Sequence, residues 1–365
     1  MSVTVRPATY ETAGAVIERL IEESGLDVAA KRVFVKPNML GEFLPEQGVD
    51  THPAVLRAVV AALERRGARV TAGDNPGMRG YGANERSARR SGLLEAAGSA
   101  WRNIGLEPVA TPVTSRFASS FIVSRPVLDA DLFISVPKFK THVATVITGA
   151  IKNSYGLIVG AQKAHLHRDA RGPTAFAEAV VDVYALRPPD FVIVDGVVAM
   201  QGKGPSGKDL RPLNLILAGT NGVEVDAAMA TIMGADPAAI PLLAEAHRRG
   251  LGEIDLTRVT VDGDLTPAPG FKLPFFRPER GGRVSGVGAF LARLLTYLAA
   301  GRPVLRRKAC VRCGVCARQC PVDAITMTPY PTIDTDRCVL CYCCNEFCDY
   351  DAMDVQRRVR LFRRR

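Results

Sequence analysis

The sequence predicts an α/β fold, in which a mostly parallel sheet is covered by helices, followed by a small C-terminal α+β module rich in cysteine. Two observations predict it. Short apolar runs alternate with helical patterns over the first 265 residues, as in chains whose strands are joined by crossover helices. All nine cysteines lie between Cys310 and Cys348, which marks a separate unit at the end.

The expected strands are short and apolar, and most are followed by polar residues or proline. They are Arg32–Val35, Val70–Ala72, Asp131–Val136, Phe191–Val194, Leu213–Ala218 and Val259–Val261. The expected helices carry apolar residues at helical spacing. They are Val16–Ile21 with an end near Gly25, His52–Arg66, Ala175–Leu186, Val225–Met233 and Ile240–Gly250. Strands separated by helices imply a largely parallel sheet with both faces covered.

Changes in composition divide the chain into four parts. Residues 1–270 form the predicted α/β domain with an anionic-ligand site, and residues 271–301 form a linker with an amphipathic helix over Val284–Ala300. Residues 302–356 form the cysteine module, and residues 357–365 form a basic tail. An alternative for Val284–Ala300 is a membrane-surface element. No run is long and apolar enough to span a bilayer.

The composition is ordinary for a globular protein, with 47% hydrophobic and 23% charged residues, but the net charge is +10. The tail carries six arginines, so it either binds an acidic partner or is a solvated end. No aromatic-interleaved basic stripe points to nucleic acid. We expect an acidic redox protein such as a ferredoxin as external electron donor or acceptor. The first residues are not a secretory signal, so we expect a cytoplasmic, reducing location.

The cysteines form two copies of one ligand pattern. Each copy has the spacing C-x2-C-x2-C-x3-C, which is typical of bacterial ferredoxins with two [4Fe–4S] clusters, where the fourth cysteine of each run serves the other cluster. The first cluster is therefore assigned to Cys310, Cys313, Cys316 and Cys348, and the second to Cys338, Cys341, Cys344 and Cys320. Zinc sites typically use CxxC pairs with a longer gap. Cys343 is left over, as a packing thiol or a reactive one.

Polar residues follow four of the predicted strands. Lys36 and Asn38 follow the first, Asp74 the second, and Asp195 the fourth. After the third strand, Lys138, Lys140 and His142 are spaced by two, so they project to one side of an extended chain. Since the carboxyl ends of parallel strands share one edge of a sheet, these groups are expected to form one site.

Further along, Lys152 and Asn153 are expected in the first turn of a helix, and Lys163, His165 and His167 come next. Several ammonium groups beside a helix start favour a phosphate or carboxylate ligand. The candidate substrate-binding residues are Lys36, Asn38, Lys138, Lys152, Asn153, Lys163, Asp74 and Asp195. The candidate catalytic residues are His142, His165 and Lys140, with histidine moving protons near neutral pH. Alternatively, the lysines are solvated, and Asp74 and Asp195 bind a metal or cap turns.

The loop Gly202–Asp209 resembles glycine-rich nucleotide motifs, which need a strand directly before them and a helix directly after. Arg211-Pro212 prevents a helix from following, so no nucleotide cofactor is predicted. We expect a flexible loop over the site, with Lys203 or Lys208 touching the ligand.

Several motifs together resemble the family catalogued as domain of unknown function 362, over about residues 30–350. They are Val35-Lys36-Pro37-Asn38, Thr51-His52-Pro53, Ser135–His142, Thr148–Asn153, Asp195-Gly196, Gly202–Pro205 and Val225-Asp226-Ala227, ahead of the cysteine runs with Cys341-Tyr342-Cys343-Cys344. The resemblance implies an α/β domain fused to a ferredoxin-like module, with motif residues in its site. It implies no substrate.

Three functions are compatible with these features. The first is an iron–sulfur oxidoreductase that passes electrons through two [4Fe–4S] clusters to or from an anionic small molecule on the α/β domain. The second is a ferredoxin-type electron-transfer protein that docks an acidic redox partner. The third is a non-redox lyase or isomerase with structural clusters, which is disfavoured because both ligand sets are complete and leave no open iron.

Overall fold

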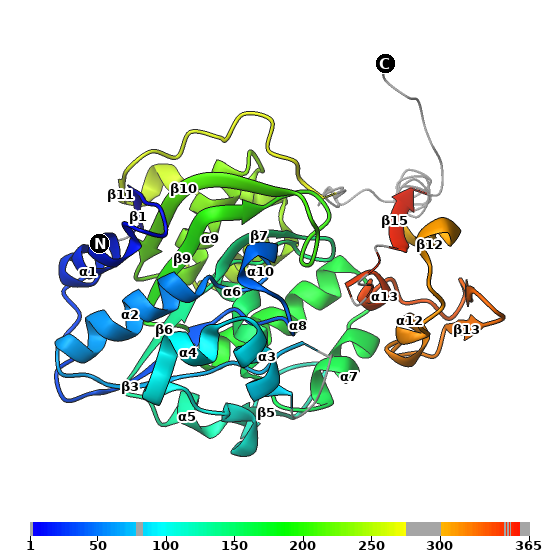
Figure 1. Ribbon diagram of the computed structural model, residues 1–365, viewed down its shortest axis with the longest axis horizontal. Helices are drawn as coiled ribbons and strands as arrows, with labels where there is room; N and C mark the ends of the chain where they lie inside the picture. Colours follow the sequence, from blue (N-terminus) through cyan, green and yellow to red (C-terminus); the bar gives the residue numbers. More distant parts are fainter. Residues whose placement is uncertain are drawn as a thin grey trace.

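A nine-stranded sheet lies at the centre of the α/β domain in the computed structural model, which describes residues 3–77, 83–274, 301–346, 348, 350 and 352–357. The order of its main path is β11-β1-β10-β9-β6-β2-β3 (Figure 1). The parallel strands of the centre are β2 (Arg32–Pro37), β3 (Arg69–Ala72), β6 (Leu132–Val136) and β9 (Phe191–Met200). The predicted α/β class is confirmed.

The sheet becomes mixed on the far side of β9. Strand β10 (Leu210–Gly219) is antiparallel to both β9 and β1 (Val3–Pro7), and β11 (Val261–Asp262) is parallel to β1. Only residues 201–209 join β9 to β10. That connection is too short for a crossover, so the two strands form a hairpin.

Helices cover both faces of the sheet. Because alternate strand side chains point to opposite sides, successive residues of one strand join different cores. Val33 and Val35 of β2 join the core under α1 (Ala13–Glu23), α2 (Pro53–Arg65) and α4 (Leu93–Ala97), with α3 (Asn84–Arg90) beside α4. Phe34, between them, joins the core under four other helices. These are α6 (Gly149–Asn153), α8 (Pro173–Leu186), α9 (Gly222–Ile232) and α10 (Pro241–Arg248).

The predicted strand end at Pro137 is confirmed, since β6 ends at Val136, whereas the predicted end of the next strand at Val194 is wrong, because β9 continues through Asp195 to Met200. Residues Lys138–His142 form β7, which runs parallel to the second half of β9, so Lys138 lies opposite Asp195 and Lys140 opposite Met200. The register shifts between these two pairs. β7 also pairs with the two-residue β8 (Val146–Ile147).

Smaller elements complete the domain. The hairpin of β4 (Pro108–Pro112) and β5 (Ser120–Ser124) precedes α5 (Arg125–Leu128), and α7 (Gln162–Asp169) precedes α8. Residues 301–357 form the cysteine module beside α7 and α8 (Figure 1). There, β12 (Gly301–Leu305) pairs with β15 (Met353–Arg357), and β13 (Ile325–Met327) pairs with β14 (Pro331–Ile333). Two short helices, α12 (Val315–Arg318) and α13 (Cys343–Glu346), follow the cysteine loops.

The predicted amphipathic helix Val284–Ala300 and residues 358–365 of the basic tail lie outside the described residues. Among the helices that are described, none has the length and apolar character needed to cross a membrane.

Candidate functional site

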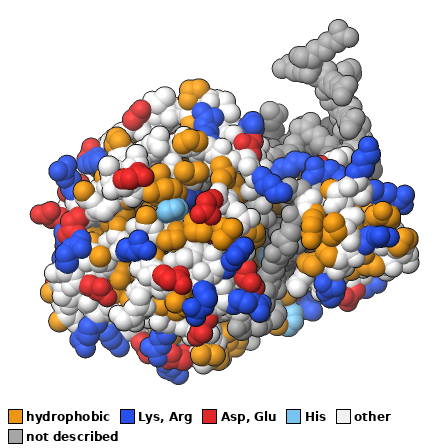
Figure 2. Space-filling view, viewed as in Figure 1, with side chains coloured by type: hydrophobic (Ala, Val, Ile, Leu, Met, Phe, Trp, Pro, Cys, Tyr) orange, Lys and Arg blue, Asp and Glu red, His pale blue; other side chains and the backbone are white. Residues whose placement is uncertain are grey.

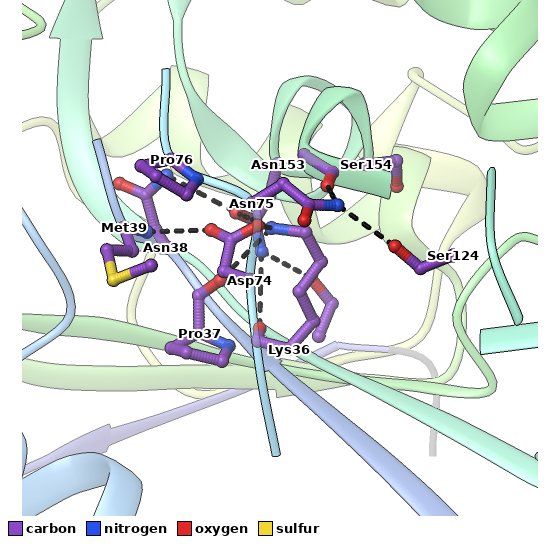
Figure 3. A network of polar contacts seen from close by, with 12 residues as sticks. Lys36, Pro37, Asn38, Met39, Asp74, Asn75, Pro76, Ser124, Asn153 and Ser154 are labelled. Carbon is purple, nitrogen blue, oxygen red and sulfur yellow. Dashed lines mark hydrogen bonds and ion pairs between the residues drawn. The ribbon is translucent and has the colours of Figure 1, made fainter. Parts of the chain in front are cut away.

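A buried ion pair occupies the ends of β2 and β3. Lys36 Nζ lies 2.7 Å from Asp74 Oδ1, and both side chains are at most 2% exposed. The same ammonium donates to Asn153 Oδ1 at 3.0 Å and to the Pro37 carbonyl at 3.1 Å (Figure 3). A Cβ atom on Gly156 would lie 2.2 Å from Asp74 Oδ1, so this glycine lets the backbone pass close to the pair. Burial lowers the pKa of Lys36 although Asp74 opposes the change.

A cavity, the basic cavity, lies beside this ion pair. Its walls come from the ends of β2, β3 and β7 and from α6 and α7. The polar and charged residues that line it are Lys36, Asn38, Asp74, Asn75, His142, Lys152, Asn153, Tyr155, Lys163 and His167. Three lysines face one carboxylate in this lining. The charge balance therefore suits an anionic ligand.

Lys163 reaches the cavity from α7. Its side chain is buried, and Nζ donates to the carbonyl oxygens of Asn75 at 2.9 Å and Pro76 at 3.1 Å. Burial lowers its pKa from 10.5 to about 7, against the attraction of Asp74 and with help from Lys36. A lysine side chain with this pKa can gain or lose a proton near neutral pH.

The two histidines of the cavity are also buried. Burial and the charge of Lys152 lower the pKa of His142 well below its ordinary range and that of His167 to about 3. Both rings are therefore neutral at pH 7 and can each donate one hydrogen bond and accept another. The His167 ring stacks on Phe176 with centroids 4.3 Å apart, and Lys152 Nζ lies 4.5 Å from the centroid of the Tyr155 ring.

The short helix α6 places Lys152 and Asn153 at the cavity, in its last turn rather than in the predicted first turn. Asp226 of α9 accepts hydrogen bonds from the backbone N–H groups of Ala150 and Ile151 at 2.6 and 3.0 Å. Gly149 has a φ of +57°, and a Cβ there would lie 2.2 Å from Asp226 Oδ1. Two motifs far apart in sequence thus form one capped helix start. Burial raises the pKa of Asp226 to about 7.

Four of the predicted site residues lie outside the cavity lining. Lys138 Nζ donates to Asp195 Oδ2 at 2.8 Å and to Tyr10 Oη at 3.0 Å, which forms a second buried cluster. Lys140 Nζ donates to the Val49 carbonyl at 2.7 Å. His165 is exposed on α7. The expectation that all these groups form one site therefore does not match the structure.

Asp74 and Asp195 each form an ion pair with a lysine rather than lining a metal-ion site. Asp74 Oδ2 also accepts from the backbone N–H of Met39, and Asp195 Oδ2 from that of His52, both at 2.8 Å. Over the described part of the chain, no three His, Cys, Asp or Glu side chains are arranged around a position for a single metal ion. A cubane cluster is a different case, because each of its four thiolates binds a different iron.

The first set of predicted cluster ligands surrounds a cavity. Cys310, Cys313, Cys316 and Cys348 all line it, although Cys348 is 32 or more residues away in sequence from the others. The carboxyl-terminal cysteine of each run accepts a backbone hydrogen bond at sulfur: Ala324 N–H donates to Cys320 at 3.2 Å, and Ala352 N–H to Cys348 at 3.1 Å. Such bonds stabilise thiolates and tune cluster potentials. The residues present therefore fit a [4Fe–4S] cluster held by the crossed set.

The second set gathers in the same crossed way. The thiols of Cys341 and Cys320 lie close enough to Cys338 to raise its pKa, after burial as the main cause. Burial, followed by Cys341 and Cys338, raises the pKa of Cys344 well above its ordinary value. Cys343 is fully buried and packs against Ala164 of α7 and Val315, as expected for a packing thiol.

The second cysteine loop lies next to the α/β domain. A cavity between them is lined by Val339, Leu340, Cys341 and Tyr342 from the loop. From the α/β domain, its lining includes Phe176 and His167. His167 therefore lines both this cavity and the basic cavity.

The loop between β9 and β10 also contacts the module, since Lys203 forms an ion pair with Asp354 of β15. This differs from the expected role of Lys203 as a ligand contact. Neither Lys203 nor Lys208 lines the basic cavity.

Comparison with known families assigns the larger domain. The family described as domain of unknown function (DUF362) matches residues 33–231. The chain belongs to the DUF362 family. A 4Fe–4S binding domain matches residues 303–326, which contain the first cysteine run of this DUF362 protein. This match supports an iron–sulfur electron-transfer capacity.

The DUF362 chain is 30% identical over 231 residues to the thylakoid-associated protein sll1697 of Synechocystis sp. (strain ATCC 27184 / PCC 6803 / Kazusa). That alignment covers 60% of this chain and 68% of the relative. Among solved structures, the lactate racemase apoprotein from Thermoanaerobacterium thermosaccharolyticum aligns with a TM-score of 0.39 and 10% identity. The alignment covers 62% of this chain and 55% of that one, so the chain spans about half of that structure.

The polar cavity residues that the sequence did not assign to the site are His167, Asn75 and Tyr155. One signal for His167 was present. On a helix, residues four apart share a face whereas residues two apart do not. Once residues 162–169 are read as a helix, Lys163 pairs with His167 rather than with His165.

Proposed function

We propose that this DUF362 protein is an iron–sulfur oxidoreductase in which two [4Fe–4S] clusters exchange electrons with an anionic small molecule bound in the basic cavity. The observation that carries the proposal is the position of His167, which lines both the basic cavity and the cavity beside Cys341. The same helix, α7, supplies Lys163 to the basic cavity and Ala164 to the packing around Cys343. The proposed electron path and the proposed substrate site thus share one structural element.

When bound, two clusters supply or accept two electrons, one each, and an external redox protein completes the balance. Residues of the chain would bind the substrate and move the proton. Lys152 and Lys163 would hold the anionic group of the substrate, while the Lys36–Asp74 pair fixes the floor of the cavity. Lys163, with its pKa of about 7, would move the proton that accompanies the electrons.

The neutral state of His142 and His167 fits this role. Neutral rings donate a hydrogen bond to an anion without adding charge, and they leave Lys163 as the group that titrates near pH 7. The sequence analysis named His142, His165 and Lys140 as catalytic candidates. In this proposal His142 stays in the site, and Lys163 replaces His165 and Lys140. The reducing, cytoplasmic location remains part of this proposal, because eight thiols must be free to bind iron.

The test uses anaerobically purified holoprotein reduced with light and a deazaflavin. A panel of small carboxylates and phosphate esters is then added, and the return of the visible charge-transfer absorption is followed. We expect at least one anion to accelerate reoxidation, and Lys152→Gln to abolish the effect. Lys31→Gln, on the surface beside Asp27, is the matched control. Anions that bind in the calorimeter but leave reoxidation unchanged would contradict an oxidoreductase.

A further inference from the structure

We propose that an acidic electron-transfer protein docks on the outer face of the first cysteine loop, residues 310–320. This inference rests on the proposed function only in requiring that the first cluster is present. The second cysteine loop lines a cavity that shares His167 with the basic cavity. Electrons must then enter or leave through another surface, and the first loop provides one.

The centre of this face is apolar and exposed. Val311 and Tyr350 are 52% and 49% exposed, and both line the cavity formed by the first set of cluster ligands. Cys313, one of those ligands, is also exposed. On the face of the module seen in Figure 2, hydrophobic side chains gather with lysine and arginine around them. An exposed apolar centre within a charged rim is typical of a protein contact site.

The charge along the first cysteine loop and the strand before it has one sign. Residues 301–318 contain six lysines and arginines and no aspartate or glutamate. Five of them are exposed, namely Arg306, Arg307, Lys308, Arg312 and Arg318. Residues 321–337, around β13 and β14, carry the opposite balance, with three aspartates and one arginine. The positive charge is therefore concentrated at the first cluster loop.

Several of these cations are held in place. The guanidinium carbons of Arg307 and Arg312 lie 5.1 and 5.7 Å from the centroid of the Tyr330 ring. Arg318 donates to the carbonyl oxygen of Cys313 at 3.0 Å. Cations that are already ordered lose less side-chain freedom when an acidic partner binds.

The position of this charge indicates which acidic partner fits. A redox protein can pass one electron to the first cluster, itself becoming oxidised by one electron, without any bond being made or broken. Charge complementarity would steer it so that its own redox centre approaches Cys313, since opposite charges accelerate and orient encounters. A nucleic acid or a membrane would use the same arginines but would give the exposed ligand no function.

The experiment follows reduction of the holoprotein by a reduced, acidic [2Fe–2S] ferredoxin in an anaerobic stopped-flow instrument. The second-order rate constant should fall as ionic strength rises. The double variant Arg307→Glu/Arg312→Glu should lower it about 10-fold to 100-fold at low salt, within the range of electrostatic steering. The matched control Arg19→Glu/Arg57→Glu makes the same charge change at exposed positions on α1 and α2 and should keep the wild-type rate.

Photoreduction by a deazaflavin should be equal in all three proteins, which shows that the clusters are intact. A wild-type rate that ignores salt would overturn the proposal without any variant. Equal losses in the two double variants would overturn it as well. So would binding of anionic vesicles through Arg307 and Arg312 with no reduction by the ferredoxin. Cluster reduction is read directly, so these outcomes are independent of whether an anionic substrate is turned over.

Discussion

Replacing Lys163 with methionine tests the electrostatics of the basic cavity. In the folded protein the pKa of Lys163 is about 7, against 10.5 for an ordinary lysine, and burial is the main cause. Between these two values the unfolded chain binds more protons than the folded protein. The free energy of unfolding of the wild type should therefore rise with pH above 7 through this residue. Methionine has similar length and no charge, so the variant lacks this contribution.

The magnitude follows from the size of the shift. One pKa unit corresponds to about 1.4 kcal/mol. Lys163 is half protonated in the folded state at pH 7, so raising the pH from 7 to 9 should increase the wild-type value by about 2 kcal/mol relative to the variant. Near pH 7 the variant should be at least as stable as the wild type, since methionine carries no buried charge.

The assay is anaerobic denaturant unfolding between pH 7 and 9, followed by the fluorescence of Trp101, the single tryptophan. Lys31→Met, at a partly exposed ammonium, should keep the wild-type pH dependence. Sulfate, whose charge is constant in this range, should bind the wild type more weakly as the pH rises and should bind Lys163→Met weakly throughout. Unfolding curves of wild type and Lys163→Met that stay parallel from pH 7 to 9 would refute this account of Lys163.

Two further predictions concern local structure. Gly149→Ala should lower the free energy of unfolding by more than about 2 kcal/mol, because the left-handed φ and the clash of the new Cβ with Asp226 disrupt the start of α6. Gly14→Ala, in an open position on α1, should be neutral or slightly stabilising. Equal effects of the two substitutions on unfolding would contradict this role of Gly149. Cys343→Ala should retain about eight irons per chain whereas Cys344→Ala should lose about half of them, as measured by iron and sulfide analysis; loss of iron from Cys343→Ala would show that the cluster assignment is wrong.

Much of the fold could be predicted because strand and helix patterns are local. The run Arg32–Val35 lies in β2 and the run Asp131–Val136 overlaps β6, and Val33–Val35 and Phe133–Val136 are buried. The direction of β10 could not be predicted from its own residues. It depends on the hairpin connection at residues 201–209, and an apolar run is the same in both directions.

The candidate site could be predicted only in part. Lys36, Asp74 and Asn153 do meet, because the carboxyl ends of β2 and β3 share an edge of the sheet. Lys138 and Lys140 carry the same ammonium group as the cavity lysines and are spaced by two with His142, which lines the cavity. Partners from distant segments nevertheless hold their side chains outside the cavity. Lys138 faces Asp195 of β9, and Lys140 donates to the carbonyl of Val49.

The sequence by itself determined the iron-binding chemistry, because a cubane site needs thiolates at short, regular spacings that are visible in the chain. It also indicated the central strands and the longer helices of the α/β domain, because burial of apolar side chains follows a local period. Only the tertiary structure decided which lysines line the basic cavity, that His167 rather than His165 faces it, and that His167 also lines the cavity beside the second cysteine loop. The reason is that these properties depend on which distant carboxylates, carbonyls and rings surround each side chain, and no local pattern encodes those neighbours.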